Sequence, residues 1–286
     1  MARCEVCFRR CEIAEGRTGF CGARGVRDGV VKAVNYGKIT SLALDPIEKK
    51  PLSRFFPGSR ILSVGSYGCN LRCPFCQNYE ISWSDAAWRY ERRAKSMLPE
   101  ELVDLAAGLR SSGNIGIAFT YNEPLIGYEF VLETARLAKK RGLKNVLVTN
   151  GTAQLSVLEK LGPYIDAMNI DLKGFTDRYY TQVIHGSRQM VMEFITRAVK
   201  LCHVELTTLI VPGENDSVEE MSALSRWVAR LEDGQGNVIG NKVPLHVTRF
   251  FPRFHMTDRD ATDIGRIRLL TETAKENLAY VFPGNC

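Results

Sequence analysis

Short apolar runs alternate with longer amphipathic segments along most of the chain, from about residue 60 onward. Short runs rich in valine, isoleucine and leucine predict buried strands. Apolar residues that recur every three or four positions predict helices with one buried face. By these patterns we expect strands at 60–64, 115–120, 144–149, 167–172, 204–211 and 243–250.

Each predicted strand is followed by one predicted helix. Strands separated by single helices pair in parallel through right-handed crossovers. Six such units are too few to close an eight-unit barrel, so they indicate a partial one. The sequence thus predicts an α/β fold, a partial (β/α)6 TIM-like barrel over residues 60–286. Its helices are expected at 99–112, 128–141, 156–161, 190–201, 217–231 and 261–277.

The first 59 residues do not follow this alternation. Residues 1–35 are rich in cysteine and arginine and are expected to form a small N-terminal extension, followed by a connector with short strands at 36–59. Apolar segments at 30–34 and 39–44 flank Asn-Tyr-Gly, which predicts a hairpin. The run Asp-Pro-Ile-Glu-Lys-Lys-Pro-Leu at 45–52 is an expected loop, because its prolines stop regular structure.

Composition is that of an ordinary globular protein, with 45% hydrophobic and 24% charged residues among 286. No run approaches the ~18 apolar residues of a membrane helix, and no apolar leader opens the sequence, so a cytoplasmic location is expected. Nine cysteines in that compartment favour metal binding over disulfides. The net charge of +6 favours an anionic cofactor or acidic partner but does not indicate nucleic-acid binding.

Three cysteines, Cys69, Cys73 and Cys76, follow the first predicted barrel strand with the spacing C-x3-C-x2-C. Three thiolates can hold three irons of a [4Fe–4S] cluster and leave the fourth iron open for another ligand. Structural zinc sites prefer four protein ligands, so zinc fits this loop poorly. The competing interpretation is a chance trio of buried thiols. One placement of the loop at 45–52 is over such a cluster.

Four more cysteines lie in the N-terminal extension, at Cys4, Cys7, Cys11 and Cys21. Four thiolates can close a tetrahedral site, and zinc, a single iron or a second cluster would each satisfy them. So short a segment has little core, so a metal would supply much of its folding free energy. The alternative for the cysteines is four unliganded thiols in a disordered tail. The arginines of this segment could contact nucleic acid, but a solvated basic surface is the expectation.

Polar residues end five successive predicted strands, where a barrel carries its functional groups. Asp171 and Lys173 are two positions apart and so share one face of a strand, where a pair or a ligand contact is expected. The alternatives are a structural ion pair for these two, a core histidine for His246 and a helix-start residue for Glu123. The polar groups occur at 120–124, 149–151, 169–173, 211–216 and 246–249.

Together these motifs resemble those of radical S-adenosylmethionine (SAM) enzymes close to the pyruvate formate-lyase activating enzymes. More narrowly, the chain is similar to the radical SAM member of the AmmeMemoRadiSam system. The resemblance rests on the four-cysteine head, the 45–52 run, Gly-Cys-Asn-Leu-Arg-Cys-Pro-Phe-Cys-Gln-Asn, Tyr-Asn-Glu-Pro, Thr-Asn-Gly, Asn-Ile-Asp-Leu-Lys-Gly, Val-Pro-Gly-Glu-Asn-Asp and His-Val-Thr-Arg-Phe.

By position, the resemblance implies that Cys69, Cys73 and Cys76 ligate the cluster. Residues 121–124 stand where activating enzymes have Gly-Gly-Glu-Pro, which meets the amino group of SAM; here both glycines are replaced. The other implied SAM contacts are Phe75 and Val211 at the adenine, Asn122 and Glu123 at the amino group, Thr149, Asn150, Asp171 and Lys173 near the methionine carboxylate and ribose, and His246 facing the bound cofactor.

The implied chemistry starts with SAM chelating the open iron. A low-potential donor such as flavodoxin or ferredoxin reduces the cluster, and one electron cleaves SAM to methionine and a 5′-deoxyadenosyl radical that removes hydrogen from a substrate. No catalytic residue beyond the cofactor-binding ones is expected. Three alternatives stay open: a glycine of a partner protein as target, a small molecule within a multi-protein system, or a binding role for the basic head.

Overall fold

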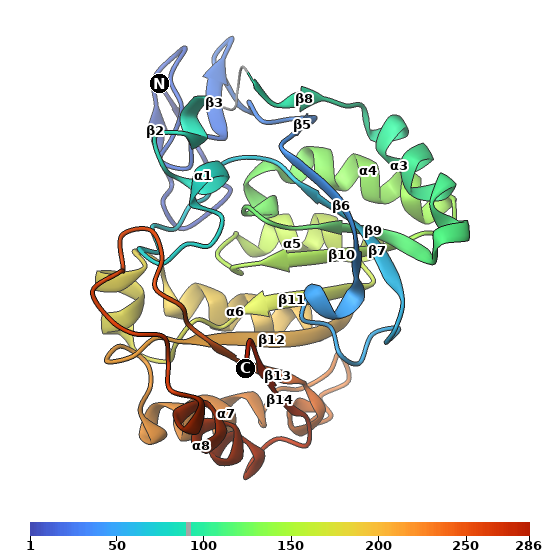
Figure 1. Ribbon diagram of the computed structural model, residues 1–286. Coiled ribbons are helices and arrows are strands. Elements are labelled where there is room, and N and C mark those ends of the chain that lie inside the picture. Colours follow the sequence, from blue (N-terminus) through green and yellow to red (C-terminus); the bar gives the residue numbers. More distant parts are fainter. Residues whose placement is uncertain (90–92) are drawn as a thin grey trace.

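A continuous eight-stranded sheet organises the molecule, in the order β14-β13-β12-β11-β10-β9-β7-β6 (Figure 1). The computed structural model describes residues 1–89 and 93–286. Seven strands pair in parallel, and β6 (Ser41–Pro46) joins β7 in antiparallel register. The parallel strands are β7 (Arg60–Gly65), β9 (Asn114–Phe119), β10 (Lys144–Thr149), β11 (Ala167–Asp171), β12 (His203–Ile210), β13 (Leu245–Arg249) and β14 (Val281–Gly284).

Six helices connect these strands and cover the outer face of the sheet (Figure 1). Three of them start at a side chain that accepts a hydrogen bond from the first turn: Ser187, Ser217 and Asp263. Each helix buries its apolar stripe against the strands, which explains the amphipathic pattern. The helices are α3 (Pro99–Gly108), α4 (Tyr128–Lys140), α5 (Leu155–Leu161), α6 (Arg188–Ala198), α7 (Val218–Val228) and α8 (Ile264–Lys275).

The predicted partial (β/α)6 barrel is confirmed, with each strand and helix within a few residues of its expected bounds. In the described ranges no pairing joins β6 to β14, so the barrel stays open between these two edge strands. The pattern missed β14, which contains a proline. It expected β6 as a short strand at 39–44 of the connector but did not place it in the barrel sheet.

The expected hairpin between 30–34 and 39–44 is wrong. The first of these segments, β4 (Val30–Ala33), pairs with β3 (Arg24–Arg27), whereas the second contributes β6 to the main sheet. Asp28 and Gly29 form the turn between β3 and β4, both with positive φ, and Glu15 accepts hydrogen bonds from their amides. The turn itself forms at residues 34–37, where the amide of Lys38 donates to the carbonyl of Asn35 at 3.0 Å, but β6 forms its complete ladder with β7 instead.

The N-terminal head, residues 1–35, consists of short antiparallel pairs and lies against the loops of the barrel (Figure 1). β1 (Ala2–Arg3) pairs with β2 (Glu12–Ile13). The amide of Gln154 donates to the carbonyl of Val6 at 2.9 Å. The head is thus joined to the loop after β10. The remaining short elements are α1 (Tyr79–Ser82) and the pair β5 (Lys38–Ile39) with β8 (Lys95–Ser96).

Residues 47–59 close the end of the barrel where the parallel strands begin. Ile47, Leu52 and Phe55 pack in one buried cluster with Ile61 at the start of β7 and Ala167 at the start of β11. The expectation that the 45–52 run covers the iron–sulfur cluster of the three-cysteine loop is therefore wrong. The apolar residues of this run fill the opposite end of the barrel. No helix in the described ranges is long and apolar enough to cross a membrane.

Candidate functional site

The three-cysteine loop begins after β7, which ends at Gly65, and is followed by the short helix α1. Cys73 is buried, and Cys69 and Cys76 are partly buried. Burial raises the pKa of all three thiols, that of Cys73 to about 12. Binding to iron offsets this cost because the metal takes the thiolate form. Two donors already point at Cys69 Sγ, the amide of Leu71 at 3.4 Å and Asn150 Nδ2 at 3.8 Å.

These three thiols lie close enough for their charges to interact with one another and with Lys173. Three thiolates suit a [4Fe–4S] cluster, which takes one thiolate at each of three irons and leaves the fourth iron open. The donor set therefore passes the test of fit for such a cluster.

The pair Asp171 and Lys173 lies at the end of β11, beside the cysteine loop. Lys173 Nζ donates to Asp171 Oδ2 at 2.8 Å, which confirms the expected pairing. Although burial alone would lower the pKa of Lys173, the charges of Asp171 and Cys73 raise it above its usual value. The ammonium group thus stays charged next to Cys73 and offsets negative charge on the thiolates.

Glu123 joins the ends of two neighbouring strands. Its carboxylate accepts hydrogen bonds from Thr149 Oγ1 at 2.7 Å, the amide of Asn150 at 2.8 Å and the amide of Leu125 at 3.0 Å. The side chain is buried, and this burial raises the pKa of Glu123 to about 7 against the lowering effect of these donors. Oε2 receives only one of the three bonds, so it keeps capacity for another donor.

The two residues before Glu123 hold the turn in place. Asn122 Oδ1 accepts from the amide of Ser66 at 2.9 Å, and its Nδ2 donates to the carbonyls of Tyr67 and Gly68 at 3.2 Å. The Asn122 amide is therefore used on the backbone of the cysteine loop. Tyr121 has φ of +71° and lies over Gly65, where a Cβ would meet its ring at 2.9 Å. Its hydroxyl donates to Asp45 at 2.8 Å, so the side chain at this position, where activating enzymes have glycine, makes a contact within the protein.

Phe75 and Val211 lie at the other side of the site. Phe75 is buried and packs edge-to-face on Phe250, which directly follows β13, at 6.2 Å between ring centroids. Val211 is fully buried at the end of β12, and its amide donates to Asn215 Oδ1 at 2.7 Å. Asn215 also donates to the carbonyl of Lys173, so it joins β12 to β11. Sequence reasoning missed this role of Asn215, since no local pattern reveals the second strand.

His246 is the second residue of β13, in register with Thr207 of β12 and through it level with Asp171 of β11. Its Nε2 is 2.7 Å from Glu205 Oε2, and His203 Nε2 is 2.9 Å from Oε1. Glu205 also accepts from the amides of Ser53 and Arg54, in the segment that closes the start of the barrel. The structure therefore gives Nε2 of His246 a protein partner, and a contact of this residue with the cofactor stays a prediction. Glu205 carried no signal in the sequence, because it is one acidic residue inside a strand.

The four head cysteines line one small cavity of about 10 Å³, about the volume that one water requires. Cys4, Cys7 and Cys21 are buried and Cys11 is partly buried. Spacing alone predicted their convergence, and the structure brings all four thiols to the same cavity. It also places Arg9 and Asn70 on the wall, which the sequence did not predict.

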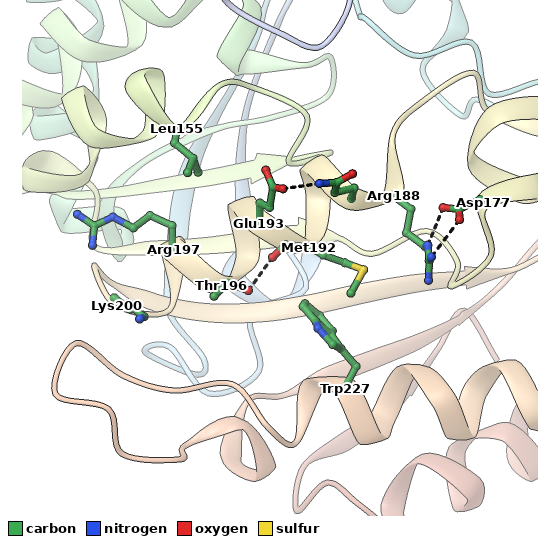
Figure 2. Close-up of a pocket in the computed structure, with 10 residues that line it drawn as sticks. Leu155, Asp177, Arg188, Met192, Glu193, Thr196, Arg197, Lys200 and Trp227 are labelled. Atoms are coloured by element: carbon green, nitrogen blue, oxygen red, sulfur yellow. Dashed lines mark hydrogen bonds and ion pairs between the residues drawn. The ribbon is translucent and has the colours of Figure 1, made fainter.

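A larger groove of about 700 Å³ lies on the outer helices, away from every cysteine in the two sets (Figure 2). Met192 of α6 and Trp227 of α7 form its apolar part, and the Arg188–Asp177 ion pair lies at one end. It lacks any of the predicted site residues and stands outside the barrel, so the site is the group around the cysteine loop.

Comparison with known proteins gives the same assignment. Residues 63–224 match the family model described as the Radical SAM superfamily. An uncharacterized protein of Methanocaldococcus jannaschii is 40% identical over 285 residues, 99% of this chain and 81% of that protein. Pyruvate formate-lyase 1-activating enzyme of Escherichia coli is 27% identical over 182 residues, 62% of this chain and 72% of the enzyme. A radical SAM methyltransferase from Sphaerobacter thermophilus shares the fold, with TM-score 0.57, 15% identity and coverage of 80% of this chain and 67% of that chain.

Proposed function

This chain belongs to the radical SAM superfamily, and on that premise we propose that it removes a hydrogen atom from a substrate by radical chemistry. The family implies a [4Fe–4S] cluster and SAM as cofactors. The observation that carries the proposal is the geometry of the cysteine loop, where three thiols share one neighbourhood beside Lys173. When bound, the cluster and SAM supply a 5′-deoxyadenosyl radical by one-electron cleavage of the sulfonium.

The residues proposed to hold the cluster are Cys69, Cys73 and Cys76. Glu123 offers the spare lone pair of Oε2 to the SAM ammonium group, and the Asp171–Lys173 pair offers both signs of charge to the methionine carboxylate and the ribose hydroxyls. Phe75 and Val211 provide buried apolar contact for the adenine. Asn122, Thr149 and Asn150 have their side chains committed to the protein and act by positioning the loops.

The closed end of the barrel also restricts which molecules can reach the radical. The segment 47–59 closes the far end of the barrel, and Lys50 and Tyr121 are bound to Asp45 there. A closed floor keeps bulk water and stray hydrogen donors from the interior. We propose no acid–base residue, since hydrogen-atom removal requires none.

For the target we propose a glycine of a partner protein, as in the activating enzymes. Support comes from the 27% identity to pyruvate formate-lyase 1-activating enzyme, which is a distant likeness. The second candidate is a small molecule handled within a multi-protein system of the AmmeMemoRadiSam type, and the closed, polar floor around Lys50 supports it. We also propose a flavodoxin- or ferredoxin-type donor and a cytoplasmic location.

A binding role for the basic head is not proposed, because its inner arginines are engaged within the protein. Arg24 Nη1 lies 2.6 Å from the Glu129 carboxylate, and Arg9 Nη2 donates to the carbonyl of His185 at 2.6 Å. Arg3 pairs with Glu5 on the surface. These contacts hold the side chains of Arg3, Arg9 and Arg24 against the protein.

The test of the proposed function is SAM cleavage by the anaerobically reconstituted chain. With a low-potential reductant and SAM, we expect methionine and 5′-deoxyadenosine in equal amounts, measured by liquid chromatography and mass spectrometry. Absence of 5′-deoxyadenosine from a chain that carries its iron would contradict the proposal. Deuterated substrates then separate the targets: label enters 5′-deoxyadenosine from a glycine-bearing partner protein or from a small molecule.

Glu123→Gln is expected to weaken SAM binding by roughly 10- to 100-fold, the usual worth of a hydrogen bond to a charged group. The raised pKa of Glu123, about 7, means that the carboxyl loses its proton as the pH rises through neutrality. A cationic ammonium prefers the carboxylate, so wild-type affinity should rise from pH 6 to pH 8.

Equilibrium dialysis with labelled SAM at both pH values measures this effect. The variant should show a much flatter pH dependence, and Glu193→Gln on the outer helix α6 should behave as the wild type. An equal pH dependence in wild type and Glu123→Gln would remove Glu123 from the SAM site.

A further inference from the structure

A long loop after β13 reaches the cysteine loop from the other side of the barrel. This loop, the strap, comprises residues 250–262 between β13 and α8. In the sheet, β12, β11, β10 and β9 lie between β13 and β7, the strand that precedes the cysteine loop. A contact between the two loops therefore spans the mouth of the barrel, where the carboxyl ends of the strands meet (Figure 1).

Thr262 fixes the base of the strap and is 1% exposed. Its amide donates to the carbonyl of Phe250 at 3.1 Å, and its hydroxyl donates to the carbonyl of Ile210 at 2.6 Å. The same hydroxyl accepts from the amide of Phe250 at 3.1 Å, and Arg249 Nε donates to the Thr262 carbonyl at 2.6 Å. The two ends of the strap are thus held together beside β12 and β13.

The tip of the strap is a tight turn that contacts the cysteine loop. Arg253 and Met256 exchange two backbone hydrogen bonds of 3.0 Å, and Met256 is buried. Between them, the amide of His255 donates to the carbonyl of Pro74 at 2.8 Å. Pro74 directly follows Cys73, so this bond attaches the strap beside a proposed iron ligand.

Phe254, inside this turn, supplies ring contacts to the segment after the cysteines. Its ring stacks on that of Tyr79 in α1, with 4.4 Å between the centroids and 8° between the planes. Trp83, the residue after α1, meets the same ring edge-on at 4.8 Å. Stacked and edge-to-face pairs are favourable aromatic geometries, so both contacts stabilise the closed tip.

The backbone of Phe254 is strained. Its φ is +57°, a left-handed conformation that costs free energy for a bulky residue. A turn that required only this conformation would take glycine or asparagine at lower cost. The contacts with Tyr79 and Trp83 offset the strain, which indicates that the phenylalanine ring serves to hold the tip against α1.

The strap also contacts a residue proposed to lie at the adenine. Phe250, its first residue, is 1% exposed and packs edge-to-face on Phe75 at 6.2 Å. Pro74 and Phe75 are the two residues between Cys73 and Cys76, so the strap contacts the whole connection between these two cysteines. Because the base is fixed beside β12, release of the tip is the motion that would uncover this connection.

We propose that the strap closes the mouth of the barrel over the cysteine loop, and that Phe254 is the positioning residue that keeps its tip closed. Closure excludes bulk water and dioxygen from the cluster proposed at this loop. The closure itself follows from the contacts of the strap, whereas what it protects rests on the proposed function.

Hydrogen–deuterium exchange of the anaerobically reconstituted chain tests the closure, measured by mass spectrometry on peptides that cover the tip. The His255 amide exchanges when its bond to Pro74 breaks, so its rate follows the open fraction of the tip. Phe254→Ala removes both ring contacts and should raise this rate by roughly 5- to 100-fold, whereas Phe254→Tyr keeps a ring and should stay within about twofold. Phe251→Ala is the matched control, since this ring is 48% exposed and lies at Arg249.

Loss of cluster absorbance in air-saturated buffer tests the shield. If oxidation proceeds through the open strap, its rate should rise in Phe254→Ala by the same factor as the exchange rate and stay unchanged in Phe251→Ala. Faster exchange with unchanged loss of absorbance would overturn the shield. Phe254→Gly adopts the φ of +57° without strain, so it gives the same two readouts if Phe254→Ala fails to fold.

The pattern of exchange separates closure from general stability. Unchanged exchange at the tip of Phe254→Ala would overturn the role of this residue, as would a rise spread over the whole chain, and both results would leave the proposed function intact. Conversely, a wild type that carries its iron and exchanges slowly at the tip but makes no 5′-deoxyadenosine would overturn the proposed function and keep the closure.

Discussion

Cys73→Ala should lose reductant-dependent 5′-deoxyadenosine formation to below detection. Three thiolates are the minimum that the loop offers to a cluster with one open iron, and no spare cysteine of the loop can replace the third. Cys73 is the buried member of the three and lies beside Lys173, whose positive charge favours its thiolate. Its loss removes a ligand and leaves that ammonium without one of its two anionic neighbours.

The measurement is iron content together with product formation under anaerobic conditions. About four irons should be lost from the loop while any iron at the head remains. Cys202→Ala is the matched control, because this thiol lies at the turn between α6 and β12 and contacts neither set. SAM cleavage by Cys73→Ala at the wild-type rate would refute the assignment of the loop.

Glu205→Ala should destabilise the fold by roughly 3–5 kcal/mol, the usual cost of removing one partner from a buried charged pair. The side chain is completely buried and holds four donors, His203, His246 and the amides of Ser53 and Arg54. Their loss removes the hydrogen bonds that attach the 47–59 segment to β12. For a chain of this size the midpoint of thermal unfolding should fall by about 10 °C.

The effect should depend on pH in a defined direction. Burial alone would raise the pKa of Glu205, but hydrogen bonds from His203, His246, Arg54 and Ser53 lower it from 4.5 to about 2. A carboxyl whose pKa falls on folding contributes stability above its unfolded value and loses it as the pH drops toward the folded value. The difference between wild type and Glu205→Ala should therefore shrink from pH 5 to pH 2.

Denaturant unfolding at pH 7 and at pH 3 measures this difference. Glu276→Ala, at an exposed position after α8, should stay within about 0.5 kcal/mol of the wild type at both pH values. A constant difference across this range would mean that Glu205 is protonated in the fold, contrary to its four donors.

Local sequence determined the barrel and the two cysteine sets. Alternation of apolar strands with amphipathic helices is a property of neighbouring residues, and parallel strands then bring their polar ends to one edge. The spacing of Cys69, Cys73 and Cys76 is covalent, so their convergence needed no knowledge of distant contacts. The pairing of Asp171 with Lys173 followed from the same two-residue period.

Only the tertiary structure decided where the remaining segments lie. The pairing of β6 with β7 moved residues 47–59 to the start of the barrel. Glu205 thereby became the partner of this segment and of His246 Nε2. Asn70 likewise lines the cavity of the head cysteines and accepts a hydrogen bond from Asn150, so residues 7, 70 and 150 lie together. Such contacts depend on the free energy of packing between segments far apart in the chain, which no periodicity within one segment encodes.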